Sequence, residues 1–458
     1  MDTAKFKEKY KDLTKALLKR YMNNREHDNV VFSPFSIIML LDIMADAAGA
    51  NTKDEIVKTL CGDMTYDEVQ EMLKQLQQKL TEDGVLNTAN AVIVKDGIRQ
   101  SIVKDYEKRI EEKFAGKLFS SKNIVQELNA WTVEKTKGMI SQIADDSMKD
   151  MLFFLANAIA FEAEWEEEYE DIDLINEDFT NADQSVSRVK MLKSVEDTYI
   201  ENEKYEGFTK PYKDVGFSYV AMLPKDKIYT ISEGDIDDVF NSSFRKAPNT
   251  IVSVKMPEFK YSFDDQLKEA FGEMGIKAAF TPEADFTGFS SEWLKIESVF
   301  HKAFIEVDRK GTKAAAISFA AGNAGGIPDF EIEYKQIILD RPFIYAIVHN
   351  ETGIPVFVGV TKYIDPLTGD DLMTEDEKDE ICRPLFENIC SWMFGDDWDG
   401  CIETGRNSPE YKLYNKAHIA YYKKNIKELQ AVADEVNDYL DRNASPGQKI
   451  VNRIMRKK

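Results

Sequence analysis

The most unusual segment of the chain runs from Glu306 to Phe330 and reads EVDRKGTKAAAISFAAGNAGGIPDF. A strand-like beginning is followed by a long series of small residues, without the bulky apolar side chains that anchor an element in a core. Taken alone, such a series is typical of a flexible surface loop. The order of its residues predicts something more specific.

Within this segment, the side chains alternate in character from Thr312 onward. One series contains only small, uncharged residues: Thr312, Ala314, Ala316, Ser318, Ala320 and Gly322. The other includes a charge and two bulky groups: Lys313, Ala315, Ile317, Phe319, Ala321 and Asn323. Because successive side chains of a strand point to opposite faces, this alternation predicts a strand with unlike faces. The small face could slide against a packed interior, so the segment is suited to become a central strand after the protein has folded.

Outside this segment, the apolar pattern predicts a mixed helix and strand protein. Apolar residues at helical spacing predict a helix over residues 3–22, and a second, largely buried helix is expected after Ser33 and Pro34. Strand-like apolar runs cover residues 87–94, 152–161, 218–223, 251–256, 300–307, 343–348 and 355–361. Clustered strands with helices elsewhere indicate an α+β domain with more than one sheet.

The composition changes near Pro366, which predicts a domain of residues 1–366 and a helical extension of residues 367–458. In the extension, an acidic stretch and a short apolar segment precede one long helical pattern that opens at Ser408 and Pro409. The apolar stripe of this helix consists of Tyr422, Ile426, Leu429, Ala433, Val436 and Leu440. We expect the stripe to pack against the protein's own body.

Charge and cysteine content exclude several classes of partner. The 458-residue chain has a formal net charge of -23, which repels nucleic acid phosphates and anionic lipid surfaces. Its cysteines are too few and too unevenly placed for a disulfide framework or a zinc site, so we expect free thiols at Cys61, Cys382, Cys390 and Cys401. No signal peptide and no long apolar run is recognisable, and by that criterion we expect a cytoplasmic protein without a membrane span.

The sequence also lacks the patterns of common enzymes. Its four histidines are His27, His301, His349 and His418. None of them is accompanied by a nucleophile elbow, a Walker loop, a dinucleotide-binding glycine motif or a zinc-binding helix motif. We therefore expect no catalytic activity, no cofactor and no metal site.

Several motifs, in the same order along the chain, resemble the serpin family of protease inhibitors, in a microbial-type member. The hinge of that family's reactive-centre loop, a glycine and a threonine followed by alanines, is similar to Gly311, Thr312, Lys313, Ala314, Ala315 and Ala316. Further similar segments are NVVFSPFSI (29–37), LNAWTVEKTKGMI (128–140), FLANAIAFEAEW (154–165), MPEFKYSF (256–263), MGIKAAFTPEADFTG (274–288), HKAFIEV (301–307) and RPFIYAI (341–347). The resemblance spans residues 3–366.

The resemblance implies a serpin fold with three β-sheets and about nine helices, metastable and with an exposed reactive-centre loop. It implies that a target serine protease, and in some cases a cysteine protease, cleaves the loop and is trapped as a covalent acyl complex while the loop inserts into the central sheet. It also favours a monomer that acts in the extracellular space. The alternative is a non-inhibitory serpin that acts as a carrier or chaperone, although such relatives often have charged or bulky inward hinge residues, which this chain lacks.

Two clusters of site residues are carried over from the resemblance. The shutter, where the strands of the central sheet part, corresponds to Ser33, Ser36, Asn157 and His301. The breach, at the top of that sheet, corresponds to Trp165, Glu258 and Arg309. Both charges of the breach are reversed relative to many relatives, so we expect Glu258 and Arg309 to form an ion pair.

The family's usual spacing, counted forward from Gly311, places the cleaved bond at Gly325 and Gly326. Counting backward from Pro342 reaches Glu331 instead, so the loop is longer than is usual in the family. Alternative specificity residues are Ala324, Ile327 and Phe330. None of these candidates is basic, which favours an elastase-like or subtilisin-like target over a trypsin-like one.

Overall fold

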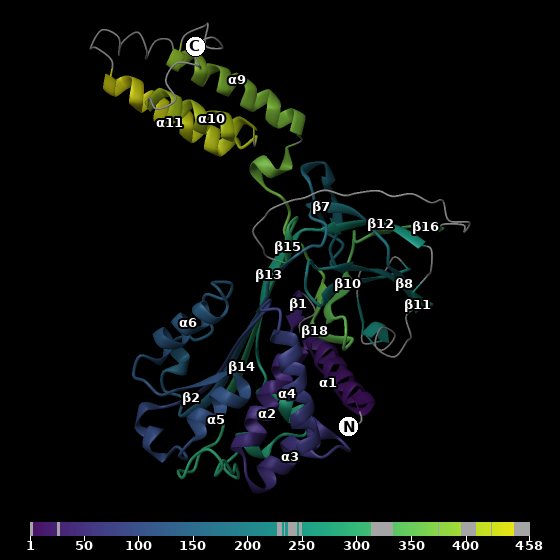
Figure 1. Cartoon of the computed structure of the whole chain (residues 1–458), viewed down its shortest axis with the longest axis vertical. Helices are drawn as coiled ribbons and strands as arrows, with labels where there is room; N and C mark the ends of the chain where they lie inside the picture. The colour runs from purple at the N-terminus through teal and green to yellow at the C-terminus, as the bar shows by residue number, and fades with distance from the viewer. Residues whose placement is uncertain are drawn as a thin grey trace. The chain divides into compact units, whose positions relative to one another are not determined.

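The structure is a computed structural model of the chain (Figure 1). It describes residues 3–24, 28–226, 231–232, 234–236, 245–246, 250–312, 333–373, 375–394, 409–422 and 424–443. The chain divides into two compact units, Met1–Asp365 and Pro366–Lys458. None of the described helices combines the length and the apolar composition that a membrane span requires.

A seven-stranded sheet, here called the central sheet, forms the middle of the first unit. Its long strands are β3 (Gly116–Phe119), β2 (Leu86–Val94), β4 (Phe153–Phe161), β14 (Ser298–Val307) and β13 (Phe259–Gln266), and two short strands, β15 (Gly311–Thr312) and β5 (Ala163–Glu164), lie at one end. All nine residues of β4 are buried. This fits its continuous apolar sequence, which is typical of a strand covered on both faces.

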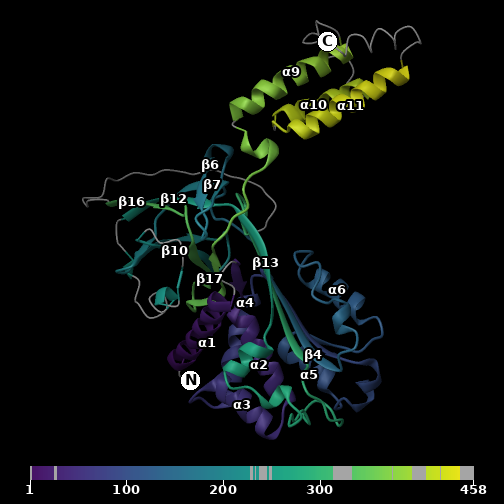
Figure 2. The ribbon, with the colours of Figure 1, turned by 180° about the vertical axis from the view of Figure 1, so that it is seen from behind.

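Helices cover both faces of the central sheet. The α-helices with described bounds in the first unit are α1 (Thr3–Asn24), α2 (Pro34–Ala47), α3 (Ala50–Cys61), α4 (Tyr66–Thr81), α5 (Tyr106–Phe114), α6 (Ile124–Lys135) and α8 (Lys268–Glu273). Figure 2 shows α6 on one face and α2 on the other. Each face has its own hydrophobic core, and the smaller core joins α6 to the alanines of β2 and β4.

Two further sheets complete the first unit. One has the order β1 (Val30–Phe32), β18 (Ile354–Thr361), β17 (Phe343–His349), β10 (Phe217–Pro224), β9 (Tyr205–Pro211), β8 (Tyr199–Glu201) and β11 (Arg245–Lys246). The other has the order β16 (Glu333–Ile338), β12 (Thr250–Pro257), β7 (Val186–Glu196) and β6 (Leu174–Thr180). The predicted three-sheet α+β architecture is therefore confirmed, and every strand-like run named above forms a strand.

The two predicted N-terminal helices are also confirmed, as α1 and α2. Ser33 caps α2, since its hydroxyl oxygen accepts the Ser36 backbone N–H over 3.2 Å, and Pro34 lies in the first turn. Every residue of α2 except Asp46 is buried. The strongly apolar sequence of this helix is thus explained by its position beneath the central sheet.

In the described part of the second unit, the α-helices are α9 (Glu375–Phe394), α10 (Pro409–Tyr422) and α11 (Ile426–Asn443), which share a hydrophobic core. The prediction of one long helix from Pro409 was wrong. Lys424 has a left-handed φ of 48°, and Asn425 Oδ1 accepts the Glu428 backbone N–H over 3.0 Å, which starts a new helix. As a consequence Tyr422 is 82% exposed and is not part of the buried stripe.

Candidate functional site

A chain of buried hydrogen bonds crosses the central sheet and reaches the start of α2. The Ser33 backbone N–H donates to His301 Nε2 over 3.3 Å, and His301 Nδ1 lies 2.8 Å from Asn157 Oδ1. Asn157 Nδ2 donates to Asn90 Oδ1 over 2.7 Å, and Asn90 Nδ2 donates to the Phe114 carbonyl over 3.0 Å. We call Ser33, Ser36, Asn90, Asn157 and His301 the polar network.

Strand register explains why three of these side chains lie in one row. Asn90 of β2 is paired with Asn157 of β4, and Asn157 is paired with His301 of β14. Side chains at paired positions point to the same face of a sheet, so the three side chains meet. The row crosses the boundary between β4 and β14, here called the seam. The hydrogen bond between His301 and Asn157 links the two strands across it.

The hydrogen bonds define the protonation state of His301. Because the Asn157 amide nitrogen donates to Asn90, the Asn157 oxygen faces the ring as an acceptor, and Nδ1 must carry the proton. Nε2 is then free to accept the Ser33 N–H. Burial lowers the pKa of His301 to about 3, so the ring is neutral at physiological pH.

The structure brings together all four residues that correspond to the shutter. Ser36 is linked through its backbone N–H to the Ser33 hydroxyl, whereas its own buried hydroxyl has no hydrogen-bond partner among the described residues. Sequence reasoning missed Asn90, which continues the network to α5. Asn90 follows two other polar residues of the same run, Asn87 and Thr88, so the sequence pattern did not distinguish it.

The seam between β4 and β14 is closed along most of its length and parted at one end. The two strands pair directly and in parallel from Phe154 and Ser298 to Ala160 and Phe304. Beyond this point β15 lies between β14 and β5, with Thr312 paired to both Val307 and Ala163. The first two hinge residues therefore already occupy a strand position in the sheet.

Both of these hinge residues are closely fitted. A Cβ on Gly311 would lie 2.1 Å from the Ala163 carbonyl oxygen and 2.8 Å from Glu164 Cα, so only glycine fits there. Thr312 is buried, and its hydroxyl oxygen lies 2.6 Å from the Tyr212 hydroxyl. This contact holds Thr312, the first residue of the small inward-facing series, inside the sheet.

The chain between β14 and β15 reverses in a tight turn, residues 308–311, here called the hinge turn. The Asp308 carboxylate accepts the backbone N–H groups of Lys310 and Gly311 over 2.8 and 3.1 Å. Trp165 is fully buried, and its indole Nε1–H donates to the Asp308 carbonyl over 2.9 Å. The Trp165 backbone N–H donates to the Lys310 carbonyl over the same distance.

Arg309 and Glu258 do not form the ion pair that the sequence predicted. The Glu258 carboxylate accepts the Arg309 backbone N–H over 3.2 Å, and its other oxygen lies 3.9 Å from Lys190 Nζ. The Arg309 guanidinium instead pairs with Asp171 over 2.5 Å. The reason is that the hinge turn directs the backbone N–H of Arg309 toward Glu258, while its side chain extends to the short helix η3 (Asp171–Asp173). Burial raises the pKa of Glu258.

The remaining predicted site residues lie outside the described residues. They are the hinge residues Lys313, Ala314, Ala315 and Ala316, and the cleavage candidates Ala324, Gly325, Gly326, Ile327 and Phe330. The described chain resumes at Glu333 with β16.

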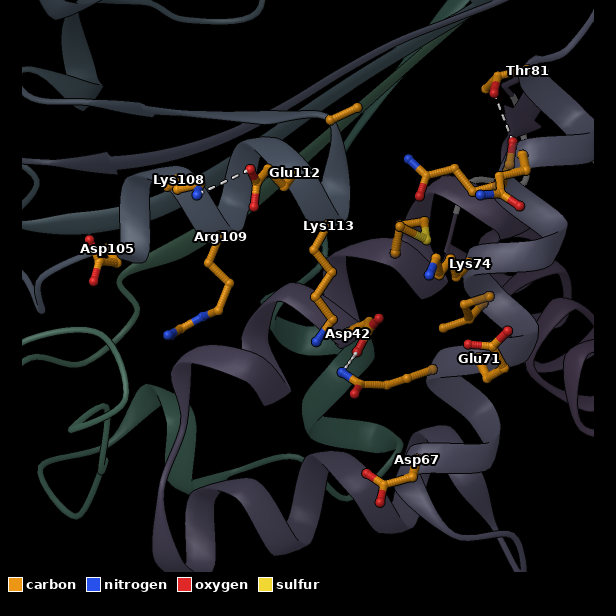
Figure 3. A pocket seen from close by; sticks show the side chains of 16 residues that line it. Asp42, Asp67, Glu71, Lys74, Thr81, Asp105, Lys108, Arg109, Glu112 and Lys113 are labelled. Carbon is orange, nitrogen blue, oxygen red and sulfur yellow. Dashed lines mark hydrogen bonds and ion pairs between the residues drawn. The ribbon is translucent and has the colours of Figure 1, made fainter.

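A pocket of about 930 Å³ lies between α2, α4 and α5, apart from the hinge turn (Figure 3). Acidic and basic side chains line it together, and Asp42 at its base accepts hydrogen bonds from Tyr66 and Gln70 over 2.7 and 3.0 Å. Burial raises the pKa of Asp42. Because both signs of charge face the pocket, it does not define the charge of a ligand.

Comparisons with known proteins agree on one family. The family model described as "Serpin (serine protease inhibitor)" matches residues 8–366. An uncharacterized serpin-like protein of Thermococcus kodakarensis is 29% identical over 73% of this chain and 80% of its own length. Leukocyte elastase inhibitor A of Mus musculus is 28% identical over 72% of this chain and 92% of its own length. The crystal structure of the thermophilic serpin tengpin in the native state matches with a TM-score of 0.70 and 30% identity, over 80% of this chain and 95% of that one.

Proposed function

The chain belongs to the serpin family and has the serpin fold, and from this premise we propose that it is a suicide inhibitor of serine endopeptidases. The observation that carries the proposal is the partly opened seam of the central sheet. Gly311 and Thr312 occupy a strand position between β14 and β5, while β4 and β14 pair directly below them. A cleaved loop that continues from Thr312 would extend this short strand by parting β4 from β14.

The energy for this step would come from new sheet hydrogen bonds. A strand of about a dozen residues would gain roughly 1 kcal/mol for each net hydrogen bond, on the order of 10 kcal/mol in total. The small side chains that alternate from Thr312 would enter the sheet interior without a bulky or charged group to bury. Strain released in this way is a known means of switching between two protein states.

The polar network is suited to a seam that must open. Parting β4 from β14 breaks the hydrogen bond between His301 and Asn157, because these residues lie on the two sides of the seam. The bond between Asn157 and Asn90 is unaffected, since both residues lie on the β4 side. Polar groups can pair again with an inserted backbone, whereas purely apolar contacts would favour one arrangement. We therefore assign the role of a shutter to this network.

The trapped species would be an acyl enzyme. The serine oxygen of the protease bonds to the carbonyl carbon of the cleaved peptide bond, and the new amino terminus leaves with the proton. Insertion of the attached loop would then carry the protease along and distort its active site, so that water no longer completes hydrolysis. The cleavage candidates include no basic residue, which favours elastase-like or subtilisin-like proteases as targets.

The test is to mix the protein with elastase-like and subtilisin-like proteases and to look for a complex that survives denaturing gel electrophoresis. We expect such a complex with the wild-type chain and with Lys313→Glu, whose side chain belongs to the outward series. Ala314→Arg, in the inward series, should give cleaved protein without a complex, because an unpaired charge would have to enter the sheet. The proposal fails if every protease that cuts between Gly322 and Glu331 is released fully active by the wild-type chain.

A further inference from the structure

A buried ion pair joins the two sheets other than the central sheet. Lys210 Nζ of β9 is 2.8 Å from Glu196 Oε1 at the end of β7, and the side chains are only 3% and 7% exposed. The same Glu196 oxygen accepts the Ser194 hydroxyl over 2.6 Å. No part of the mechanism described above uses this pair.

The ammonium group of Lys210 also faces two aromatic rings. It lies 5.6 Å from the centre of the Trp165 ring and 4.8 Å from the centre of the Tyr169 ring. Both distances are within the range of cation–π attraction, which is strongest for desolvated cations. The Tyr169 hydroxyl donates to the Ser194 oxygen over 3.2 Å, so the ring is also linked to the Glu196 side of the pair.

These two aromatic residues hold the hinge turn. Trp165 donates its indole and backbone N–H groups to the carbonyls of Asp308 and Lys310, and the Tyr169 backbone N–H donates to the Arg309 carbonyl over 3.0 Å. Trp165 and Tyr169, which both contact Lys210, thus bind three consecutive carbonyl groups of the hinge turn. Trp165 is further stacked on Tyr212, with ring centres 4.7 Å apart, and Tyr212 contacts Thr312.

Stability alone is a weak reason for such a pair. Removing two charges from water costs about as much as their attraction returns, and well-packed apolar residues of similar size often stabilise a protein as much or more. A cation between two rings, however, fixes their positions in a way that an aliphatic side chain cannot. Its location points to a role in positioning the hinge turn.

We propose that Lys210 is a positioning residue for loop insertion, which rests on the proposed inhibitory function. Its ammonium group, neutralised by Glu196, keeps Trp165 and Tyr169 where their donors bind the hinge turn. Gly311 and Thr312 are thereby held in the sheet before cleavage, as the first pair from which the loop inserts. Without this support, insertion begins later and hydrolysis of the acyl enzyme competes more successfully.

Four variants separate positioning from stability. Lys210→Met leaves Glu196 buried without its partner, whereas the double variant Lys210→Met with Glu196→Leu removes both charges together. Lys210→Arg keeps the cation, and Lys255→Met removes a paired lysine of β12 that contacts Glu177 of β6, away from the hinge turn. The first measurement is hydrogen exchange of the amides of Trp165 and Tyr169, which reports on the hinge turn whether or not the protein inhibits a protease.

We expect the double variant to recover the wild-type melting temperature but to exchange these amides about tenfold faster. It should also consume several inhibitor molecules for each protease molecule trapped, while Lys210→Arg and Lys255→Met remain close to wild type. The proposal is overturned if amide exchange in the double variant equals that of the wild type, or if exchange and inhibition follow the melting temperature in all four variants. A wild-type chain that traps no protease would instead refute the proposed function, and the exchange result would still show whether Lys210 positions the turn.

Discussion

At the scale of single residues, His301 is the side chain that links the two strands of the closed seam within the polar network. It is 1% exposed and accepts the Ser33 N–H through Nε2, so protonation at that nitrogen would replace an acceptor by a donor facing a donor. The energetic consequence is a dependence of stability on pH. It has a definite sign because the pKa of His301 is lowered in the folded state.

We predict that the uncleaved protein loses stability as the pH falls through the window from about 6.5 to about 3. In this window an unfolded histidine binds a proton and the folded His301 does not, so stability rises with pH at about 1.4 kcal/mol per unit. Urea unfolding of wild type and His301→Gln at several pH values measures the difference. Because burial also lowers the pKa of His349, His349→Gln is the matched control. Parallel pH profiles of wild type and His301→Gln would contradict the assignment.

Gly311 is the residue at which the hinge is most tightly confined. We predict that Gly311→Ala expels β15 from the sheet, because the new methyl group would collide with the backbone of Ala163 and Glu164. The variant should be cleaved as a substrate, with much less trapped protease on a denaturing gel. Gly272→Ala is the control, since a Cβ there meets no atom within 4 Å. Equal trapping by both variants would show that the seating of β15 is irrelevant to inhibition.

At the scale of elements, strand register decides which residues meet. The apolar runs predicted β2, β4, β10, β12, β14, β17 and β18 but not other strands such as β7 and β13. The four residues that the resemblance assigned to the shutter lie close together in the structure. Asn90 and Tyr212 could not be predicted, since their roles depend on which strand pairs with which and in what register. The pairing of Arg309 was misjudged for the same reason, because the position of η3 is not encoded near Arg309 in the sequence.

The link between Glu258 and the hinge turn therefore runs through the backbone N–H of Arg309. We predict that a double-mutant cycle of Arg309→Met and Glu258→Gln gives a coupling energy below about 0.5 kcal/mol in unfolding experiments. The cycle of Arg309→Met with Asp171→Asn should give about 0.2–1 kcal/mol, as for other exposed ion pairs. A coupling above about 1 kcal/mol between Arg309 and Glu258 would restore the side-chain pair that the sequence suggested.

In the second unit, the break between α10 and α11 was missed for a local reason. Asn425 followed by Glu428 is a capping pattern, but the apolar spacing continues through it and masks the new helix start. The residues that follow the break, Leu429, Ala433 and Val436, are buried as the stripe predicted. Periodicity thus identified the buried face of α11 without identifying where the helix begins.

At the scale of the whole molecule, the two units have separate cores. Among the residues that the structure describes, the buried apolar residues of the first unit end at Ile364, and the core of the second unit is built from α9, α10 and α11. We predict that a chain ending at Pro366 folds and traps proteases as well as the full chain does. Its melting temperature should lie within a few degrees of that of the first unit in the full chain. Thermal unfolding and trapping assays of both chains test this. A truncated chain that is soluble but no longer traps protease would assign the second unit a part in inhibition.

The central claim is that the loop becomes a strand between β4 and β14 once it is cut. It is tested most directly by the thermal unfolding of the same protein before and after cleavage between Gly322 and Glu331. A gain on the order of 10 kcal/mol from new sheet hydrogen bonds should raise the unfolding midpoint by at least about 10 °C. A cleaved chain that unfolds at the same or a lower temperature than the intact chain would contradict insertion, and with it the proposed mechanism of inhibition.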